Sequence, residues 1–251
     1  MPYADNAGVK IHYEVEGTPG KPTIVFQHGF LGRLQTWRDR GYVDRVKDDF
    51  HVLLVDARGH GDSDKPHDPE AYDMRNRVLD ITAVMDAEGV QQAHYHGYSM
   101  GGTIGWASMI YAPQRFLSWT IGGSMPMLDL ADAEFRASQD FDEYYRDALT
   151  RNPATKAADE AGLQDRVALK AAHAERAKWR GAEQAVRVAK GPILLYVGTE
   201  DKPHSGAVRS QELNPNLRLI ELQGDDHGQA AQRPEIVVPA MLEMIESVSV
   251  A

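Results

Sequence analysis

The chain has 251 residues, with 27 Lys or Arg against 37 Asp or Glu, so its formal net charge is −10. This length fits one sizeable domain, with or without an insertion, better than two independent domains. The negative charge gives no reason to bind nucleic acid, because phosphate recognition needs clustered Lys and Arg. The absence of cysteine excludes disulfides, thiolate metal sites and a cysteine nucleophile.

The N-terminal residues lack the basic and apolar stretches of a secretory signal, and no apolar run is long enough to cross a bilayer. The missing disulfides are compatible with a reducing compartment. We therefore expect a soluble, cytoplasmic protein with no membrane partner.

Short β-rich runs recur along the chain. Residues 9–16 alternate apolar and polar side chains, which is typical of a half-exposed antiparallel strand near a sheet edge. Four later runs are short and largely apolar, as expected of parallel strands that are covered on both faces. These runs are residues 23–26, 51–55, 93–96 and 193–197, and a further strand is expected over 217–222.

Helical periodicity lies between these runs. Met74, Val78, Ile81 and Met85 are spaced as on one face of a helix. Further helices are expected over 100–111, which ends before a proline, and over 236–248. Strands that alternate with helices predict an α/β fold, with a mostly parallel sheet and helices on both faces.

Residues 124–190 interrupt the alternation, because they are rich in alanine and charge and contain no convincing strand. The strand at 193–197 resumes the sheet, so this interval reads as an insertion into a core formed by 1–123 and 191–251. It is either a solvated helical decoration or a short helical cap over the carboxyl ends of the strands, where open α/β sheets bind ligands. We favour the cap.

The sharpest motif is GYSMG at residues 97–101, between the expected strand 93–96 and the expected helix 100–111. This is the G-x-S-x-G nucleophile elbow in its strand–turn–helix setting. The serine takes a strained conformation there, and the glycines leave room for strand and helix to approach closely. Its hydroxyl is raised at the positive end of a helix. Ser99 is therefore the predicted nucleophile, the alternative being a structural serine in a glycine turn.

On this motif and four others in the expected order, the chain resembles the α/β-hydrolase superfamily over essentially its whole length. HGF at 28–30 stands where the family has its oxyanion loop, and DARGHGDS at 56–63 looks like the family's D-x-R-G-x-G-x-S turn. GTED at 198–201 stands where the family carries its triad acid, and GDDH at 224–227 where it carries its histidine. The order serine, acid, histidine is typical of this fold.

The resemblance implies a catalytic triad. His227 would take the proton of Ser99 and later give it to the leaving group, since histidine titrates near neutrality. Asp201 would fix the imidazole tautomer and stabilise the imidazolium. Glu200 is adjacent to Asp201, so either carboxylate could face the histidine, and we favour Asp201.

The backbone N–H groups of Phe30 and Met100 are expected to form the oxyanion hole. Apolar side chains around these motifs are candidates for a substrate pocket, with core packing as the alternative for each of them. The candidates are Phe30, Leu31, Trp37, Trp106, Met125, Met127, Tyr144, Tyr145 and Trp179. His28 and His60 are expected to shape turns. No further ligand pattern accompanies the other histidines, so we expect no metal and no cofactor beyond water.

The function predicted from these residues is a serine hydrolase that cleaves small to medium uncharged esters or lactones through an acyl-enzyme. Ser99 replaces the aspartate of the related haloalkane dehalogenases and epoxide hydrolases, which argues against both. A carbon–carbon bond hydrolase or a cofactor-free perhydrolase would use the same triad. A ligand receptor or regulatory protein and a lyase stay open on the same fold. The physiological substrate and the oligomeric state, including a homo-oligomer, also stay open.

Overall fold

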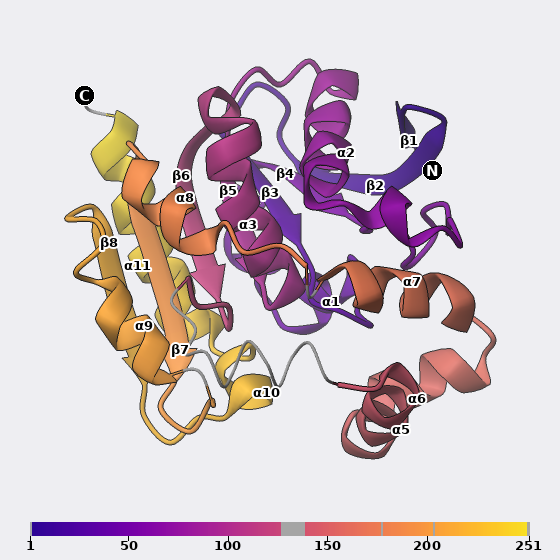
Figure 1. The fold of residues 1–251 in the computed structure, drawn as a ribbon. Coiled ribbons are helices and arrows are strands. Elements are labelled where there is room, and N and C mark those ends of the chain that lie inside the picture. Colours follow the sequence, from indigo (N-terminus) through magenta and orange to yellow (C-terminus); the bar gives the residue numbers. More distant parts are fainter. Residues whose placement is uncertain (1, 127–138, 177, 203, 250–251) are drawn as a thin grey trace.

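The chain forms an eight-stranded sheet in the order β1-β2-β4-β3-β5-β6-β7-β8, seen in the computed structural model (Figure 1). This structure describes residues 2–126, 139–176, 178–202 and 204–249. β1 pairs with β2, and β2 with β4, in antiparallel fashion, while the other neighbouring strands are parallel. The strands are β1 (Tyr3–Asn6), β2 (Val9–Gly17), β3 (Thr23–Gln27), β4 (His51–Val55), β5 (Ala93–Tyr98), β6 (Phe116–Gly122), β7 (Ile193–Gly198) and β8 (Leu217–Leu222). The predicted α/β class and the antiparallel strand near one edge are confirmed.

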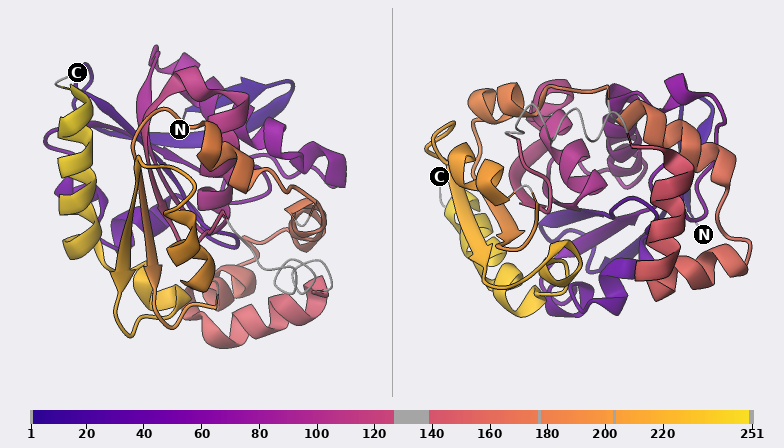
Figure 2. Two further views of the ribbon diagram at one scale, coloured as in Figure 1. Left: turned by 60° about the vertical axis from the view of Figure 1, so that its left-hand side comes forward. Right: turned by 60° about the horizontal axis from the view of Figure 1, so that its bottom comes forward.

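Helices cover both faces of the sheet (Figure 2). Those of the described residues are α1 (Gln35–Asp39), α2 (Met74–Ala87), α3 (Met100–Tyr111), α5 (Phe141–Arg151), α6 (Pro153–Glu160), α7 (Arg166–Arg176), α8 (Ala182–Val188), α9 (His204–Ser210), α10 (His227–Ala230) and α11 (Pro234–Ser249), with 3₁₀ turns η1 (Val43–Arg45), η2 (Pro69–Tyr72) and η3 (Pro113–Arg115). Helix α3 spans the predicted 100–111. Helix α2 begins where the side chain of Asp73 accepts a hydrogen bond from the N–H of Arg75. No helix in the described parts of the chain is long and apolar enough to cross a membrane.

The apolar runs are buried on both sides because consecutive strand residues face opposite helix layers. In β3, Ile24 and Phe26 belong to the core beneath α1 and α11, whereas Val25 belongs to the core beneath α2, α3 and α8. Burial of both faces is the reason that the central strands read as unbroken apolar sequence.

The structure corrects the expected position of Trp37. Its side chain is only 1% exposed and lies in the core beneath α1 and α11. Its ring centroid is 5.1 Å from that of Phe26 and 4.7 Å from that of His96. Trp37 is therefore part of the packing under the sheet rather than of a substrate pocket.

The predicted insertion divides into two parts in the structure. Helix α8 packs on the sheet layer, because its residues Ala185 and Val186 are fully buried in the same core as α3. Helices α5, α6 and α7 lie together at one end of the molecule, away from α8 (Figure 1). We refer to residues 141–176 as the α5–α7 segment.

Replacing Trp37 tests its position in the core. Trp37→Ala removes a fully buried indole, so we expect it to lower the free energy of unfolding by about 3–5 kcal/mol. Urea denaturation followed by circular dichroism measures this change. Tyr111→Ala, at the exposed end of α3, is the control and should change stability by about 0.5 kcal/mol or less. An equally small loss for Trp37→Ala would contradict the core assignment.

Candidate active site

Ser99 occupies the junction between β5 and α3 in a conformation that few non-glycine residues adopt. Its φ is +54° and its ψ is −109°, and it is the residue preceding the first turn of α3. Such a backbone costs about 1–3 kcal/mol and persists only when its surroundings enforce it. The Ser99 N–H donates to the carbonyl of Gly122 at 2.8 Å, and the Ser99 carbonyl accepts from the N–H of Thr103 at 3.0 Å.

The two glycines of the motif are required by close backbone contacts. A Cβ on Gly97 would collide with the backbone of Gly101, and a Cβ on Gly101 would collide with the carbonyl of Gln27 in β3. The spacing of the motif therefore follows from how tightly α3 crosses the ends of β5 and β3.

Ser99, His227 and Asp201 form one continuous hydrogen-bonded chain. The Nε2 of His227 is 3.1 Å from the Ser99 Oγ, and its Nδ1 is 2.7 Å from the Oδ2 of Asp201. The His227 side chain is 47% exposed and that of Asp201 is 6% exposed. An Nδ1–H that donates to the buried carboxylate leaves Nε2 free to accept the serine proton.

Hydrogen bonds join the loops after β7 and β8 and thereby fix the position of the His227 imidazole. The N–H of Glu200 donates to the carbonyl of Asp225 at 3.0 Å, while the Asp225 carboxylate accepts from Arg233 Nε at 2.7 Å. Asp226 caps α10, whose first residue is His227. The side chain of Glu200 is exposed, and the carboxylate that meets His227 belongs to Asp201.

Tyr98 is a part of the site to which the sequence assigned no role. Its hydroxyl donates to the backbone carbonyl of His227 at 2.5 Å, and its ring centroid is 5.3 Å from that of the imidazole. Burial raises the pKa of Tyr98 well above its usual value, so the phenol stays a donor. The only signal in the sequence was its place next to the serine in the motif.

The loop after β3 lies beside the serine. A Cβ on Gly29 would be 3.4 Å from the Ser99 Cβ, and the next residues include Leu31, whose φ is +63°. His28 braces this loop, because its Nε2 accepts from the Ala57 N–H at 3.0 Å and its Nδ1 donates to the Gly29 carbonyl at 2.8 Å. Burial lowers the pKa of His28, which keeps the ring neutral for this double role.

Within the described residues, neither backbone N–H predicted for the oxyanion hole has a backbone acceptor. Met100 is the first residue of α3, where helix geometry provides no intrahelical acceptor. For Phe30, no backbone hydrogen bond is found within the described part of the chain. Both groups can therefore donate to a ligand.

The Phe30 side chain connects this loop to the α5–α7 segment. Its ring centroid lies 5.8 Å from that of Tyr144 on α5 and 6.0 Å from that of His173 on α7. On its other side it meets His60 edge-on at 5.3 Å. Burial lowers the pKa of His60 to about 3, so this ring is neutral and serves packing.

The remaining pocket candidates are dispersed. Leu31 and Tyr144 gather with Phe30 in one apolar cluster, next to the predicted oxyanion loop. Trp106 is fully buried, with its indole N–H on the carbonyl of Ser124, and Met125 lies in the same core. Trp179 packs at the edge of that core, and Tyr145 donates to Asp159 within the α5–α7 segment. Met127 lies outside the described residues.

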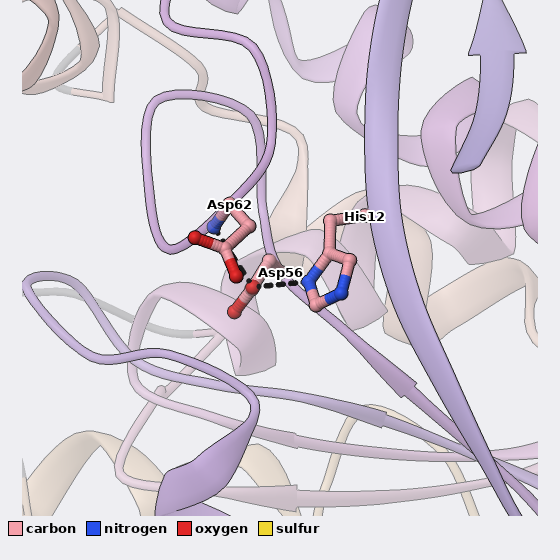
Figure 3. A group of neighbouring side chains, drawn as sticks. All are labelled: His12, Asp56 and Asp62. Carbon is pink, nitrogen blue, oxygen red and sulfur yellow. Dashed lines mark hydrogen bonds and ion pairs between the residues drawn. The ribbon is translucent and has the colours of Figure 1, made fainter. Parts of the chain in front are cut away.

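The turn at 56–63 supports the predicted oxyanion loop, through the group drawn in Figure 3. Asp56 accepts hydrogen bonds from His12 Nδ1 at 2.8 Å, from the Asp62 N–H at 3.1 Å and from the Leu34 N–H at 2.7 Å. Potential ligand atoms of His12, Asp56 and Asp62 lie within 4.8 Å of one another, close enough for a cation. Because the Asp56 oxygens already accept three hydrogen bonds, we interpret the group as structural.

The matching family model has the description α/β hydrolase fold and covers residues 22–165, so the chain belongs to this family. Epoxide hydrolase A of Mycobacterium tuberculosis is 32% identical over 110 residues, which are 43% of this chain and 34% of that protein. The chain spans about a third of the length of the first curated relatives it matches.

Two solved structures resemble the whole chain in fold. A hydrolase from Pseudomonas aeruginosa superposes with a TM-score of 0.82 at 22% identity, covering 97% of both chains. The enol-lactonase from Burkholderia xenovorans superposes with a TM-score of 0.79 at 20% identity, covering 98% of this chain and 100% of that one. This likeness shows the fold.

The His12–Asp56 pair should make stability depend on pH. The hydrogen bond to Asp56 raises the pKa of His12 above 6.5, against the effect of burial. Its contribution is then fully present below pH 6.5 and is lost as the pH rises through the raised pKa. We expect His12→Asn to cost more unfolding free energy at about pH 6 than at about pH 9. Urea titrations of both proteins measure this, and an equal cost at the two pH values would refute the pairing.

Proposed function

We propose that this protein is a serine hydrolase that cleaves carboxylic esters or lactones through an acyl-enzyme. The observation that carries the proposal is the hydrogen-bonded chain from Ser99 Oγ through His227 to Asp201, at a strained elbow. All three residues follow the carboxyl ends of parallel strands, where sheets of this kind bind ligands.

In the first half-reaction, His227 Nε2 removes the serine proton as Oγ attacks the substrate carbonyl carbon. The negative charge that develops on the carbonyl oxygen is stabilised by the N–H groups of Phe30 and Met100, each worth about 3 kcal/mol. Protonated Nε2 then gives its proton to the departing alcohol oxygen, and the acyl group remains on Ser99.

In the second half-reaction, His227 removes a proton from water, which attacks the acyl carbonyl. Protonated His227 then gives this proton to the departing Ser99 Oγ, which releases the acid and restores the free enzyme. Asp201 keeps the Nδ1–H oriented and stabilises the imidazolium in both halves. Tyr98 holds the His227 backbone, so the ring can move its proton without moving away from Ser99.

Chemistry at Ser99 favours esters and lactones over epoxides, although relatives by sequence are named epoxide hydrolases. Opening an epoxide with a serine hydroxyl would leave an ether on the enzyme. An ether has no carbonyl for water to attack, whereas an acyl-serine has one. The fold likeness to an enol-lactonase adds lactones to the substrates that we propose.

We assign the α5–α7 segment the role of a cap that selects a small-molecule substrate. Gln164 donates to the Leu31 carbonyl at 3.3 Å, and Tyr144 and His173 contact Phe30. The segment thereby packs on the loop that would bind the oxyanion. In this proposal the sheet and the other helices, including α8, form the hydrolase core.

Replacing the nucleophile tests the proposal directly. Ser99→Ala should abolish labelling by a fluorophosphonate probe and lower the turnover of short p-nitrophenyl esters by about 10⁴-fold or more. Circular dichroism should show an intact fold. Ser205→Ala, at an exposed position in α9, is the matched control and should label and turn over like the parent protein. Absence of labelling in the folded parent would overturn Ser99 as nucleophile. Labelling without turnover across an ester panel would favour a receptor.

A paired substitution separates the two acidic neighbours. Asp201→Asn leaves a side chain of the same shape but disfavours the needed histidine tautomer, so kcat should fall by about 10⁴-fold. Glu200→Gln alters an exposed carboxylate and should lower kcat by far less. Steady-state kinetics on one ester measure both, and the reverse ranking would move the acid to position 200.

A further inference from the structure

The guanidinium of Arg176 lies against the predicted oxyanion loop. Arg176, the last residue of α7, has its Cζ 5.2 Å from the ring centroid of Phe30 and 5.2 Å from that of Tyr144. No carboxylate pairs with it in the described parts of the chain. The side chain is partly exposed, so its remaining N–H donors can reach a ligand.

Six other cationic side chains between residues 151 and 187 differ from Arg176, because each is paired with a carboxylate. The pairs are Arg151–Asp147, Lys156–Glu160, Arg166–Asp159, Lys170–Asp142, Lys178–Glu175 and Arg187–Glu183. The chain has an excess of acidic residues. A cation that rests against two aromatic rings in such a chain keeps its position while its fork of donors stays available for an anion.

A second guanidinium is buried on the same side of the site. Arg77 donates to the carbonyls of Tyr72 at 2.8 Å and Ala172 at 3.0 Å, and contacts the Met100 sulfur at 3.2 Å. Burial lowers its pKa to about 10, which leaves it charged at neutral pH. The nearby Asp80 is already paired with Arg58. Arg77 and Arg176 therefore lie against the side chains of Met100 and Phe30, the two residues whose N–H groups are the predicted oxyanion donors.

His173, on the same helix as Arg176, is a second side chain with an unpaired polar atom in the described structure. It precedes Arg176 by three residues, so both lie on one face of α7. Its Nε2 donates to the Gln139 carbonyl at 3.1 Å, and its buried Nδ1 has no hydrogen-bond partner among the described residues. A bound anion would offset the Arg176 charge and favour a proton on Nδ1, which could then donate a hydrogen bond.

We propose that Arg176 binds a carboxylate of the substrate, so that the preferred substrates are esters or lactones with a free carboxylate, such as half-esters of dicarboxylic acids. This inference rests on the proposed function, because it places the carboxylate beside the side chain of Phe30, whose N–H is a predicted oxyanion donor. It replaces the uncharged substrate expected from the sequence. The overall charge acts through solvent that screens it within about 10 Å, whereas Arg176 would touch the ligand.

The test compares mono-p-nitrophenyl adipate with its neutral methyl ester, after subtraction of spontaneous hydrolysis. The measured quantity is the ratio of the two kcat/KM values, charged over neutral. Arg176→Gln should lower this ratio by about 10- to 100-fold, the loss expected for hydrogen bonds to a charged group. Arg176→Lys keeps the charge and should lower it less. Arg166→Gln, on the same helix, is the matched control and should leave the ratio unchanged.

A binding measurement separates this inference from the hydrolase proposal. Adipate should bind Ser99→Ala in calorimetry, and the double variant with Arg176→Gln should bind at least about tenfold more weakly. Turnover that depends on Ser99 with a ratio insensitive to Arg176 would overturn the carboxylate site and leave the hydrolase proposal standing. Adipate binding that depends on Arg176 without turnover of any ester would overturn the hydrolase proposal alone. Adipate binding unaffected by Arg176→Gln would overturn the site.

Discussion

The close crossing of β5 and α3 at Ser99 is the constraint on which the rest of the site depends. Because α3 begins within contact of the β3 carbonyl at Gln27, only glycine fits at position 101, and the serine between strand and helix must take a positive φ. That geometry directs the hydroxyl toward His227 and leaves the Met100 N–H without an acceptor inside the helix. The strain of Ser99 is offset by the buried apolar residues of α3.

Further hydrogen bonds hold the loops around this junction in position. His28 links the loop after β3 to the turn after β4, and Asp56 links that turn to β2 through His12. On the other side, Tyr98 and Arg233 hold the loop that carries His227. Each support is a hydrogen bond made by a buried or partly buried polar group, which fixes a loop more firmly than exposed contacts do. The geometry at Ser99 therefore depends on side chains from most of the sheet.

Much of this could be predicted from the sequence where one local pattern determines one structure. The apolar runs gave the central strands, the spacing of Met74 to Met85 gave α2, and the glycine spacing located the elbow. Long-range packing could not be read in this way. The sequence around Trp37 is compatible with a pocket position, but the fold places its side chain in the core under the sheet. The sequence of α8 is similar to that of the insertion, but in the fold Ala185 and Val186 pack in the same core as α3. The contact of Tyr98 with His227 joins residues 129 positions apart, so no local signal shows it.

The net charge of the chain is another property that does not predict the local structure of the site. The total of −10 is a property of composition, and it suggests a weak bias against anions. A bound ligand, however, experiences the groups within a few ångströms, where the dielectric is low and counterions are scarce. Near Phe30 these groups are Arg176 and, beneath Met100, Arg77, and each lacks an ion-paired carboxylate in the described structure. The aromatic faces of Phe30 and Tyr144 fix the first, and three backbone and sulfur contacts fix the second. A positive field built from restrained groups needs little reorganisation when an anion binds, so the local arrangement outweighs the sign of the whole chain.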